Sequence, residues 1–544
     1  MQKFPGNLLA AALATLLVAG CAVGKLSGPS PDEDPGDPAD TGDPADTDPG
    51  ADTGGPPPGD TGGTDTGKPP DPGPSTSPAM TNLSIKEIAF FQGVKVSVAK
   101  DGAKSSSLAP VIAGRGALVR VYVEPMAGWS AREVEGELTL VSSAGTTHYN
   151  ATLTPSSASS DAALGSTLNF DVPAGVIASD SQYSVALLSK AGAPPAGDSS
   201  KSRFPASGTQ ALSARNTGSV LKIKIVPIQY GADGSNRLPD TSPSQIEAYR
   251  QAFYGMYPAA KVEVSVRAPY PYSSGISANG SGFGNALNAM VKLRQSDGAP
   301  ADTYYYGAFN GASSFGSYCG GGCVTGLCGL LTSPADSVGR ACVGVGFTGE
   351  VSTGTAAHEI GHAHGRSHAP CKTSDYDPSY PYSGGAIGAW GYDLVSKQLF
   401  SPSATKDIMG YCDPKWISDY TFKALADRMA SVTGGALILS APFEPTRYRF
   451  VNVGAGGTLS WGEPLVLRER PLGEPHSVTF DLGDGKSQTV IGSYYPYGDL
   501  DGGYMLVPEP AASYAGIHVR DLVPGVDARL PAAHSAVAPL STSE

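Results

Sequence analysis

Four of the eight histidines of the chain lie within the eleven residues from His358 to His368. His358 and His362 are four positions apart, so on a helix both imidazoles project from the same face. Two imidazoles placed in this way can hold one Zn²⁺ at roughly 2.0–2.1 Å. Glu359 adjoins the first of them, and Gly365 tolerates the left-handed backbone that lets the chain leave the helix and bring back His368. The spacing therefore predicts a zinc site with three histidine ligands and an open fourth position.

A histidine-rich surface helix with incidental spacing is the alternative interpretation of this stretch. In a chain of this composition, the full H-E-x-x-H-x-x-G-x-x-H pattern is expected by chance on the order of once in 10⁵ sequences. We therefore favour the metal site. His364 belongs to the same run, but its position on the helix turns it to another side, so we exclude it from the predicted ligands.

The extended motif resembles the signature of the metzincin superfamily of zinc endopeptidases, which have a methionine in a tight turn beneath the metal. Here the segment Asp407–Cys412 (D-I-M-G-Y-C) follows His368 by about 40 residues and matches that turn. The resemblance implies that Met409 is the turn methionine, although Met409 alone would be read as a core residue. It also implies that Glu359 is the general base, and that Tyr411 helps near the metal or the oxyanion, as in astacin-like and serralysin-like members but not in matrixin-like ones.

The resemblance implies a catalytic domain at residues 216–435, and the strands and helices that alternate there agree with a mixed sheet carrying an active-site helix. On either side, apolar residues alternate with period 2 in short runs separated by glycine, serine and proline. This pattern predicts an immunoglobulin-like sandwich at residues 82–215 and a second β-sandwich at residues 436–544. The predicted fold class is thus an α+β metzincin-like catalytic domain flanked by two all-β sandwich domains.

Six cysteines lie in the predicted catalytic domain, and an even number in an exported chain predicts disulfides. They are Cys319, Cys323, Cys328, Cys342, Cys371 and Cys412. Cys371 follows the third ligand, His368, and Cys412 follows Met409 in the methionine-containing turn (the Met-turn). If both segments border the metal, as the resemblance implies, Cys371 and Cys412 are neighbours and form one bridge. The other pairings stay open, and a zinc-thiolate site at Cys319, Cys323 and Cys328 is the alternative.

Residues 1–21 predict an export signal. Lys3 is followed by an apolar run, Leu8–Val18, that is too short to span a bilayer. The run ends in V-A-G-C at Cys21, which resembles a bacterial lipobox, whereas an ordinary signal peptide with a chance cysteine is the alternative. We therefore expect a lipid anchor on Cys21 and a place in the bacterial cell envelope, as an outer-membrane lipoprotein that faces the outside or is released from it.

Residues 22–81 form a linker of Asp, Pro, Gly and Thr that has too few apolar side chains to fold. Over residues 27–80 it holds 12 acidic residues and one lysine, so it accounts for −11 of the net charge of −13. The acidity therefore belongs to the tether, and no basic patch indicates a nucleic-acid partner. The aspartate repeats lack the EF-hand pattern, which leaves calcium binding unsupported.

The function that these features predict is that of a surface-anchored zinc endopeptidase acting on extracellular proteins or glycoproteins. In architecture the chain resembles bacterial mucin-cleaving metalloproteases of the TagA/StcE type. A non-catalytic adhesin or glycan-binding protein on the same scaffold is the alternative, but the presence of Glu359 argues against it. An amidase or deformylase is a third interpretation, and the additional β domains favour a macromolecular substrate over a small one. The oligomeric state is left open.

Overall fold

The computed structural model describes residues 71–544 except 191, 219, 435–442, 524–525 and 533–544. The predicted export signal, the lipid-anchored Cys21 and nearly all of the linker therefore lie outside the described residues. Asp71–Glu544 is one of the two compact units of the chain, and the described elements belong to it. Within the described part of this unit, no helix combines the length and the apolar character needed to cross a bilayer.

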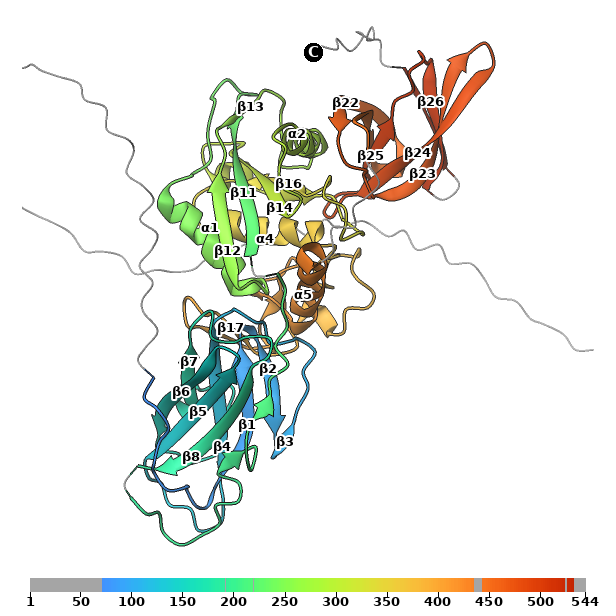
Figure 1. Ribbon diagram of the computed structural model, residues 1–544. Coiled ribbons are helices and arrows are strands. Elements are labelled where there is room, and N and C mark those ends of the chain that lie inside the picture. Colours follow the sequence, from blue (N-terminus) through green and yellow to red (C-terminus); the bar gives the residue numbers. More distant parts are fainter. Residues whose placement is uncertain (1–70, 191, 219, 435–442, 524–525, 533–544) are drawn as a thin grey trace, which may run out of the picture. The chain divides into compact units, whose positions relative to one another are not determined.

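Two antiparallel sheets come first in the chain (Figure 1). The first contains β1 (Leu83–Phe91), β2 (Gly93–Lys100), β3 (Ala103–Lys104), β4 (Ala117–Pro125), β7 (Leu168–Val172), β17 (Gly391–Tyr392) and β18 (Leu399–Phe400) in the order β18-β17-β2-β1-β4-β7, with β3 on β2. The second contains β5 (Val134–Ser142), β6 (Gly145–Leu153), β8 (Gln182–Ser189), β9 (Arg203–Phe204) and β10 (Gln210–Ala211) in the order β10-β8-β5-β6, with β9 on β8. Buried valine, isoleucine and phenylalanine side chains fill the space between them.

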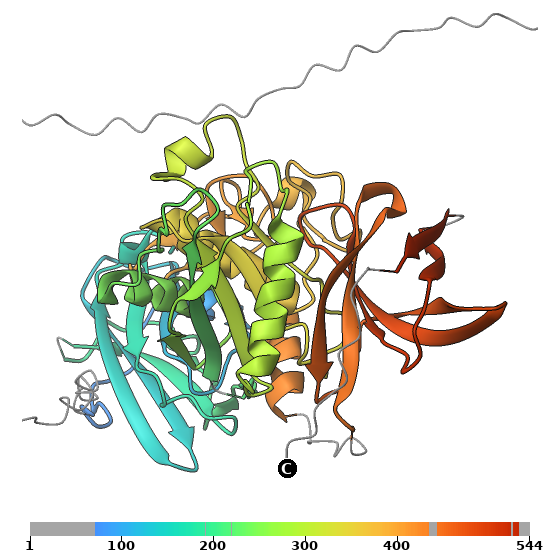
Figure 2. The same ribbon diagram turned by 90° about the horizontal axis from the view of Figure 1, so that it is seen from above.

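The central sheet carries the histidine-rich helix and is parallel except at one edge (Figures 1 and 2). Its strands are β11 (Val220–Tyr230), β12 (Lys261–Val266), β13 (Tyr270–Tyr272), β14 (Thr303–Phe309), β15 (Gly326–Cys328) and β16 (Ala341–Val345). The order is β12-β11-β14-β16-β15, with β13 also on β11, and the edge strand β15 is antiparallel to β16. Both β14 and β16 are buried along their whole length, as expected for parallel strands covered on both faces.

Five α-helices accompany this sheet within the described residues. They are α1 (Pro243–Met256), α2 (Phe283–Ser296), α3 (Phe315–Tyr318), α4 (Glu350–Ala363) and α5 (Asp419–Gly434). Helix α1 begins at a capping signal, because the Ser242 hydroxyl accepts a hydrogen bond from the backbone N–H of Gln245 and Pro243 occupies the first helical position. Between α4 and α5, the short strands β19 (Lys406–Asp407) and β20 (Lys415–Trp416) pair in parallel.

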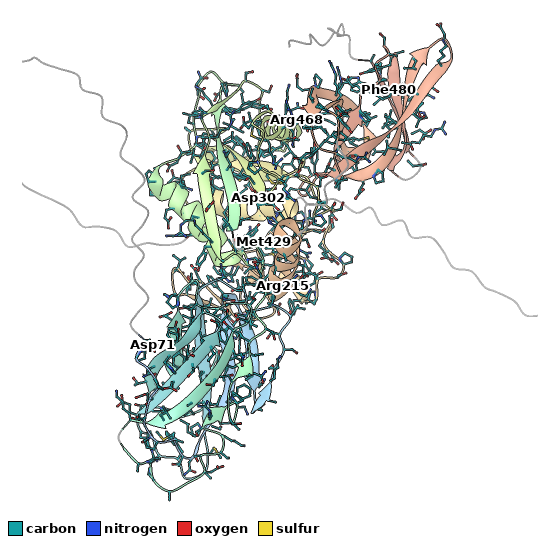
Figure 3. The ribbon with its side chains drawn as sticks, viewed as in Figure 1. Asp71, Arg215, Asp302, Met429, Arg468 and Phe480 are labelled. Carbon is teal, nitrogen blue, oxygen red and sulfur yellow. A yellow bond between two sulfur atoms is a disulfide. The ribbon has the colours of Figure 1, made fainter. Side chains whose placement is uncertain are left out.

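The last part of the chain forms one antiparallel sheet. Its strands are β21 (Thr446–Val453), β22 (Leu459–Leu467), β23 (Glu474–Gly483), β24 (Lys486–Pro496), β25 (Gly503–Pro508), β26 (Gly516–Val523) and β27 (Val526–Pro531) in the order β22-β21-β25-β24-β23-β26-β27. Phe480 of β23 is fully buried in a small cluster within this sheet (Figure 3). On the side of the catalytic region, Asn288 of α2 donates to Asn452 of β21, and Tyr495 of β24 donates to the buried carboxylate of Asp336 at 2.6 Å.

The predicted fold class, an α+β metzincin-like domain flanked by two β-sandwiches, is wrong. Strands make up 38% and helices 15% of the structure, which makes it a β-rich fold with several curled sheets. The C-terminal strands form one sheet instead of two facing ones. The main buried core extends from Met80 to Leu506 and includes residues of all three regions, beside two smaller clusters. The error has a physical cause: period-2 patterns show which face of a strand is apolar, but not which sheet the strand joins.

Strands β17 and β18 illustrate this point. They follow the histidine-rich segment in sequence, yet they extend the sheet of β1 and β2, where Gly391 pairs with Val94 and the backbone N–H of Lys95 donates to Trp390 at 2.7 Å. The indole N–H of Trp416 also donates to the backbone of Gly93. The predicted catalytic region and the N-terminal sheets therefore share one hydrogen-bonded framework.

Candidate active site

Helix α4 presents the first two predicted ligands and then ends at a glycine. Gly365 has φ +79°. Its backbone N–H donates to the backbone carbonyl of His362, and the N–H of the next residue, Arg366, donates to the backbone carbonyl of Gly361. These two bonds form a Schellman cap, which turns the chain sharply away from the helix axis. The turn carries the chain on to His368, as the spacing predicted.

Three imidazoles converge beside this cap. The Nε2 atoms of His358 and His362 lie 3.1 Å apart, and both rings pack edge-on or tilted against the ring of His368. All three side chains are buried, with at most 8% of their surface exposed. The structure therefore brings together the three histidines that the motif singled out.

Backbone carbonyls set the tautomer of each ring. Nδ1 lies 2.8 Å from Ile408 O in His358, 2.6 Å from Arg366 O in His362 and 3.2 Å from Asp375 O in His368. Because a carbonyl oxygen only accepts, each Nδ1 carries the proton and each Nε2 presents a lone pair to the centre. This outer set of hydrogen bonds is the arrangement that orients histidines toward a metal.

The fourth group at the centre is Asp499, which the sequence analysis did not identify. Its Oδ1 lies 3.2 Å from Nε2 of His358 and 3.3 Å from Nε2 of His368, and its Oδ2 lies 3.4 Å from Nε2 of His362. Asp499 belongs to the connection between β24 and β25, which is 131 residues beyond His368 in sequence. Sequence spacing carries no signal for it, because one aspartate in a Gly-Asp turn looks like any other surface residue.

The four donor groups fit Zn²⁺. A tetrahedral zinc with ligands at roughly 2.0–2.1 Å separates neighbouring ligand atoms by roughly 3.3 Å. The four separations given above, 3.1–3.4 Å, are close to this value, and all the ligand atoms lie within 4.8 Å of one another. Two imidazole lone pairs that face each other at 3.1 Å repel unless a cation lies between them. Among the described residues, Asp499 Oδ2 and Glu359 Oε2 are also buried without a hydrogen-bond partner. A zinc ion held by three histidines and Asp499 satisfies the three Nε2 atoms and the Asp499 carboxylate.

Glu359 lies deep beside the ligands and is only 1% exposed. Burial, with the nearby charge of Asp499, raises the pKa of its carboxyl group well above the ordinary value. The side chain rests on Gly326 of β15, where an added Cβ would lie 2.2 Å from Oε1. Only glycine at this point of the edge strand leaves room for the Glu359 carboxylate.

The segment Asp407–Cys412, which the sequence predicts to be the Met-turn, packs against α4. Met409 is 1% exposed, and its sulfur would lie 2.5 Å from a Cβ on Gly361. The buried carboxylate of Asp407 accepts from the N–H groups of Met409 and Ser418, which shapes the turn. Since the neighbouring Ile408 carbonyl accepts from His358, the turn also orients the first ligand.

Tyr411 projects toward the same centre. Its hydroxyl lies 2.7 Å from Nε2 of His368 and donates to Oδ1 of Asp499 at 2.7 Å. Burial of the hydroxyl raises the pKa of Tyr411, so it stays protonated and able to donate. Tyr411 therefore lies beside the three histidines, and its catalytic role stays a prediction.

The six cysteines of the predicted catalytic region all form disulfides. They pair as Cys319–Cys323, Cys328–Cys342 and Cys371–Cys412. The last pair is the one that the sequence favoured. It ties the segment after His368 to the segment after Met409, whereas Cys328–Cys342 ties the edge strand β15 to β16. The zinc-thiolate alternative is excluded, because its three cysteines are consumed in two of these bridges.

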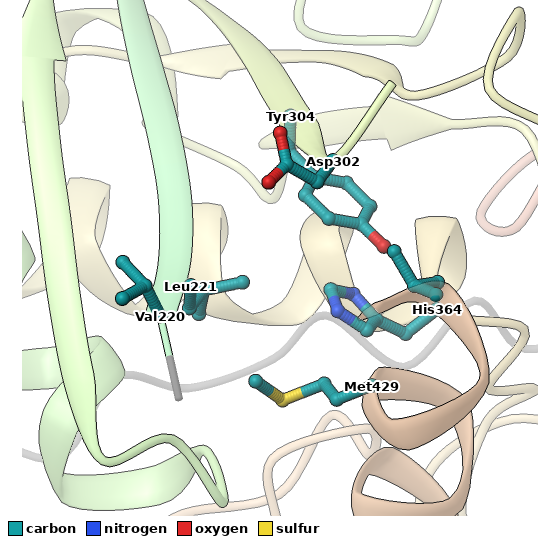
Figure 4. A pocket seen from close by; sticks show the side chains of 7 residues that line it. Val220, Leu221, Asp302, Tyr304, His364 and Met429 are labelled. Atoms are coloured by element: carbon teal, nitrogen blue, oxygen red, sulfur yellow. The ribbon is translucent and has the colours of Figure 1, made fainter. Parts of the chain in front are cut away.

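His364 is separate from the site, as its helical position predicted. Its ring stacks on Tyr304 with centroids 4.4 Å apart, and burial lowers its pKa to about 3. It lines a small pocket with Val220, Leu221, Asp302, Tyr304, Met429 and Val432 (Figure 4). A neutral histidine packed among apolar and aromatic side chains has a structural role here.

Comparison with known proteins bears on the same region. The sequence model of the family described as Peptidase M66 matches residues 278–436, a range that contains the three histidines, Glu359 and the Met-turn. No curated protein matches the sequence. Together with the histidine cluster, the family match indicates a zinc metallopeptidase. Asp499 lies outside the matched range.

Proposed function

We propose that the protein is a zinc-dependent endopeptidase of the metzincin type that hydrolyses peptide bonds of extracellular proteins or glycoproteins. The observation that carries the proposal is the convergence of three Nε2 lone pairs with the buried carboxylate of Glu359 beside them. The metzincin assignment rests on the ligand motif and on Met409 beneath it, and not on the fold class.

Zn²⁺ bound at this centre supplies Lewis-acid polarisation of a carbonyl and of water. The residues of the chain perform the remaining steps. Glu359, buried beside the three imidazoles, is suited to accept a proton from the attacking water and to pass it to the leaving amine. Tyr411 keeps its proton and can donate a hydrogen bond to the developing oxyanion. The three backbone carbonyls keep the imidazoles in place throughout.

The same proposal includes the cellular location. The V-A-G-C sequence that ends at Cys21 supports lipid attachment at the bacterial cell envelope. The acidic, proline-rich stretch that follows supports a tether that holds the folded part away from the membrane. A protease in this position acts on proteins or glycoproteins outside the cell.

Paired substitutions on α4 test the chemistry. Glu359→Ala removes the proton acceptor, whereas Glu350→Ala changes an exposed glutamate in the first turn of the same helix. General-base loss costs about 10²–10⁴-fold in rate, so Glu359→Ala should lose cleavage of a peptide library and retain its zinc, and Glu350→Ala should behave as wild type. Zinc is measured by mass spectrometry and cleavage with and without a chelator. A protein without zinc, or equal cleavage by Glu359→Ala, would falsify the proposal and favour the adhesin alternative.

A further inference from the structure

We propose that the protein is latent as folded, because residues 496–502, here called the closing segment, occupy its active site. In this inference, which rests on the proposed function, Asp499 takes the fourth zinc position and the preceding residues take the place of a substrate strand. The closing segment connects β24 to β25 of the C-terminal sheet. Substrate gains access when the segment is displaced or cut.

The backbone of the closing segment pairs with the end of the edge strand β15. The N–H of Gly498 donates to the backbone carbonyl of Cys328 at 2.9 Å, and the N–H of Leu330 donates to the backbone carbonyl of Pro496 at 2.8 Å. Between these bonds, Gly329 and Tyr497 form an antiparallel bridge. An exposed sheet edge binds extended peptides by this kind of strand addition. The segment therefore uses the hydrogen bonds that an extended substrate would use beside the metal.

The fit of the segment against the ligands is close. A Cβ on Gly498 would lie 2.4 Å from Cδ2 of the His362 ring, so only glycine allows the backbone to approach this far. The next residue, Asp499, then reaches all three imidazoles and accepts from Tyr411. The hydroxyl proposed to stabilise the oxyanion is thus engaged by the segment itself.

Anchors on both sides of Asp499 hold the segment in place. Tyr497 packs on the start of α2, where a Cβ on Gly284 would lie 2.5 Å from its hydroxyl. Leu500 packs on Gly280, where an added Cβ would lie 2.9 Å from a methyl group of Leu500. The N–H of Tyr497 donates to Gly502 at 3.0 Å and closes the turn. These contacts make the segment an ordered part of the site.

Covalent connection gives the closing segment an advantage over any substrate. Its carboxylate and backbone compete from within the same chain, at an effective concentration that free peptides do not reach. Opening is governed by the equilibrium between the closed and open states, and minor states of this kind hold about 0.1–10% of molecules. Preventing closure should therefore raise cleavage about 10- to 1000-fold.

The test compares Asp499→Ala with Asp501→Ala in the full chain. Asp501 is an exposed aspartate in the same segment and is the matched control. Asp499→Ala should raise kcat/KM for peptide cleavage, and Asp501→Ala should not. Acetohydroxamate, a small zinc chelator that needs the position held by Asp499, should bind at least tenfold more tightly to Asp499→Ala by calorimetry. The Co²⁺-substituted protein should change its visible spectrum on Asp499→Ala alone.

The outcomes separate this inference from the proposed function. Equal cleavage, equal acetohydroxamate affinity and equal Co²⁺ spectra in wild type and Asp499→Ala overturn latency and leave the peptidase standing. Lower cleavage in Asp499→Ala with zinc retained also overturns it, because Asp499 then belongs to the working site. Tighter acetohydroxamate binding without cleavage in any variant supports the closing segment and counts against the peptidase.

Discussion

Replacing Gly365 by alanine tests whether the helix cap positions the third ligand. The left-handed backbone at φ +79° costs a residue with a Cβ roughly 1–2 kcal/mol. The new Cβ would also lie 2.8 Å from the backbone oxygen of Leu331, which cannot move aside as a flexible side chain would. We expect a loss of folding stability of about 2–3 kcal/mol when both effects are counted.

The same substitution should weaken zinc binding at least tenfold. His368 lies three residues beyond the cap, so a shift of the turn moves its Nε2 away from the other two despite the bond from Nδ1 to the Asp375 carbonyl and the contact with Tyr411. Gly354→Ala is the matched control, because Gly354 lies inside α4 with no atom within 4 Å of a Cβ. That change should stabilise the helix by about 0.5–1 kcal/mol.

Thermal unfolding in the presence of a chelator measures the stability of the two variants without metal. Competition with a chromophoric chelator measures their zinc affinity. If Gly365→Ala melts at or above the wild-type temperature, or if both variants bind zinc as wild type does, the Schellman cap does not position His368. A fall in stability with unchanged zinc affinity would mean that His368 reaches the metal without the Schellman cap.

Two further predictions concern the third ligand and the anchor. His368→Ala removes one of the three Nε2 ligand atoms. It should lower zinc affinity by more than the roughly 10–100-fold that loss of an outer hydrogen-bond partner costs, while circular dichroism shows an unchanged fold. The control His148→Ala, on β6, should leave zinc affinity and fold unchanged. Cys21→Ser should move the protein from the membrane to the soluble fraction of cells, and an unchanged distribution by immunoblot would show that lipid on Cys21 is not its anchor.

Much of the site could be predicted because its determinants are local in sequence. The i, i+4 spacing on a helix places His358 and His362 together. Gly365, three residues before His368, ends the helix and brings the third histidine in. Met409 and Tyr411 followed from the resemblance and lie beside the ligands. Export and lipid attachment, predicted from the first 21 residues, concern a part of the chain outside the described residues.

The three-histidine site and its glutamate could be placed from local spacing alone, because helical geometry relates nearby residues to one another. The pairing of β17 and β18 with the N-terminal sheet, the β-rich fold and the position of Asp499 at the metal centre became known only from the folded chain. All three have one cause. Strand pairing and the docking of a distant connection depend on which surfaces meet, and hydrophobic periodicity and local spacing carry no record of that choice.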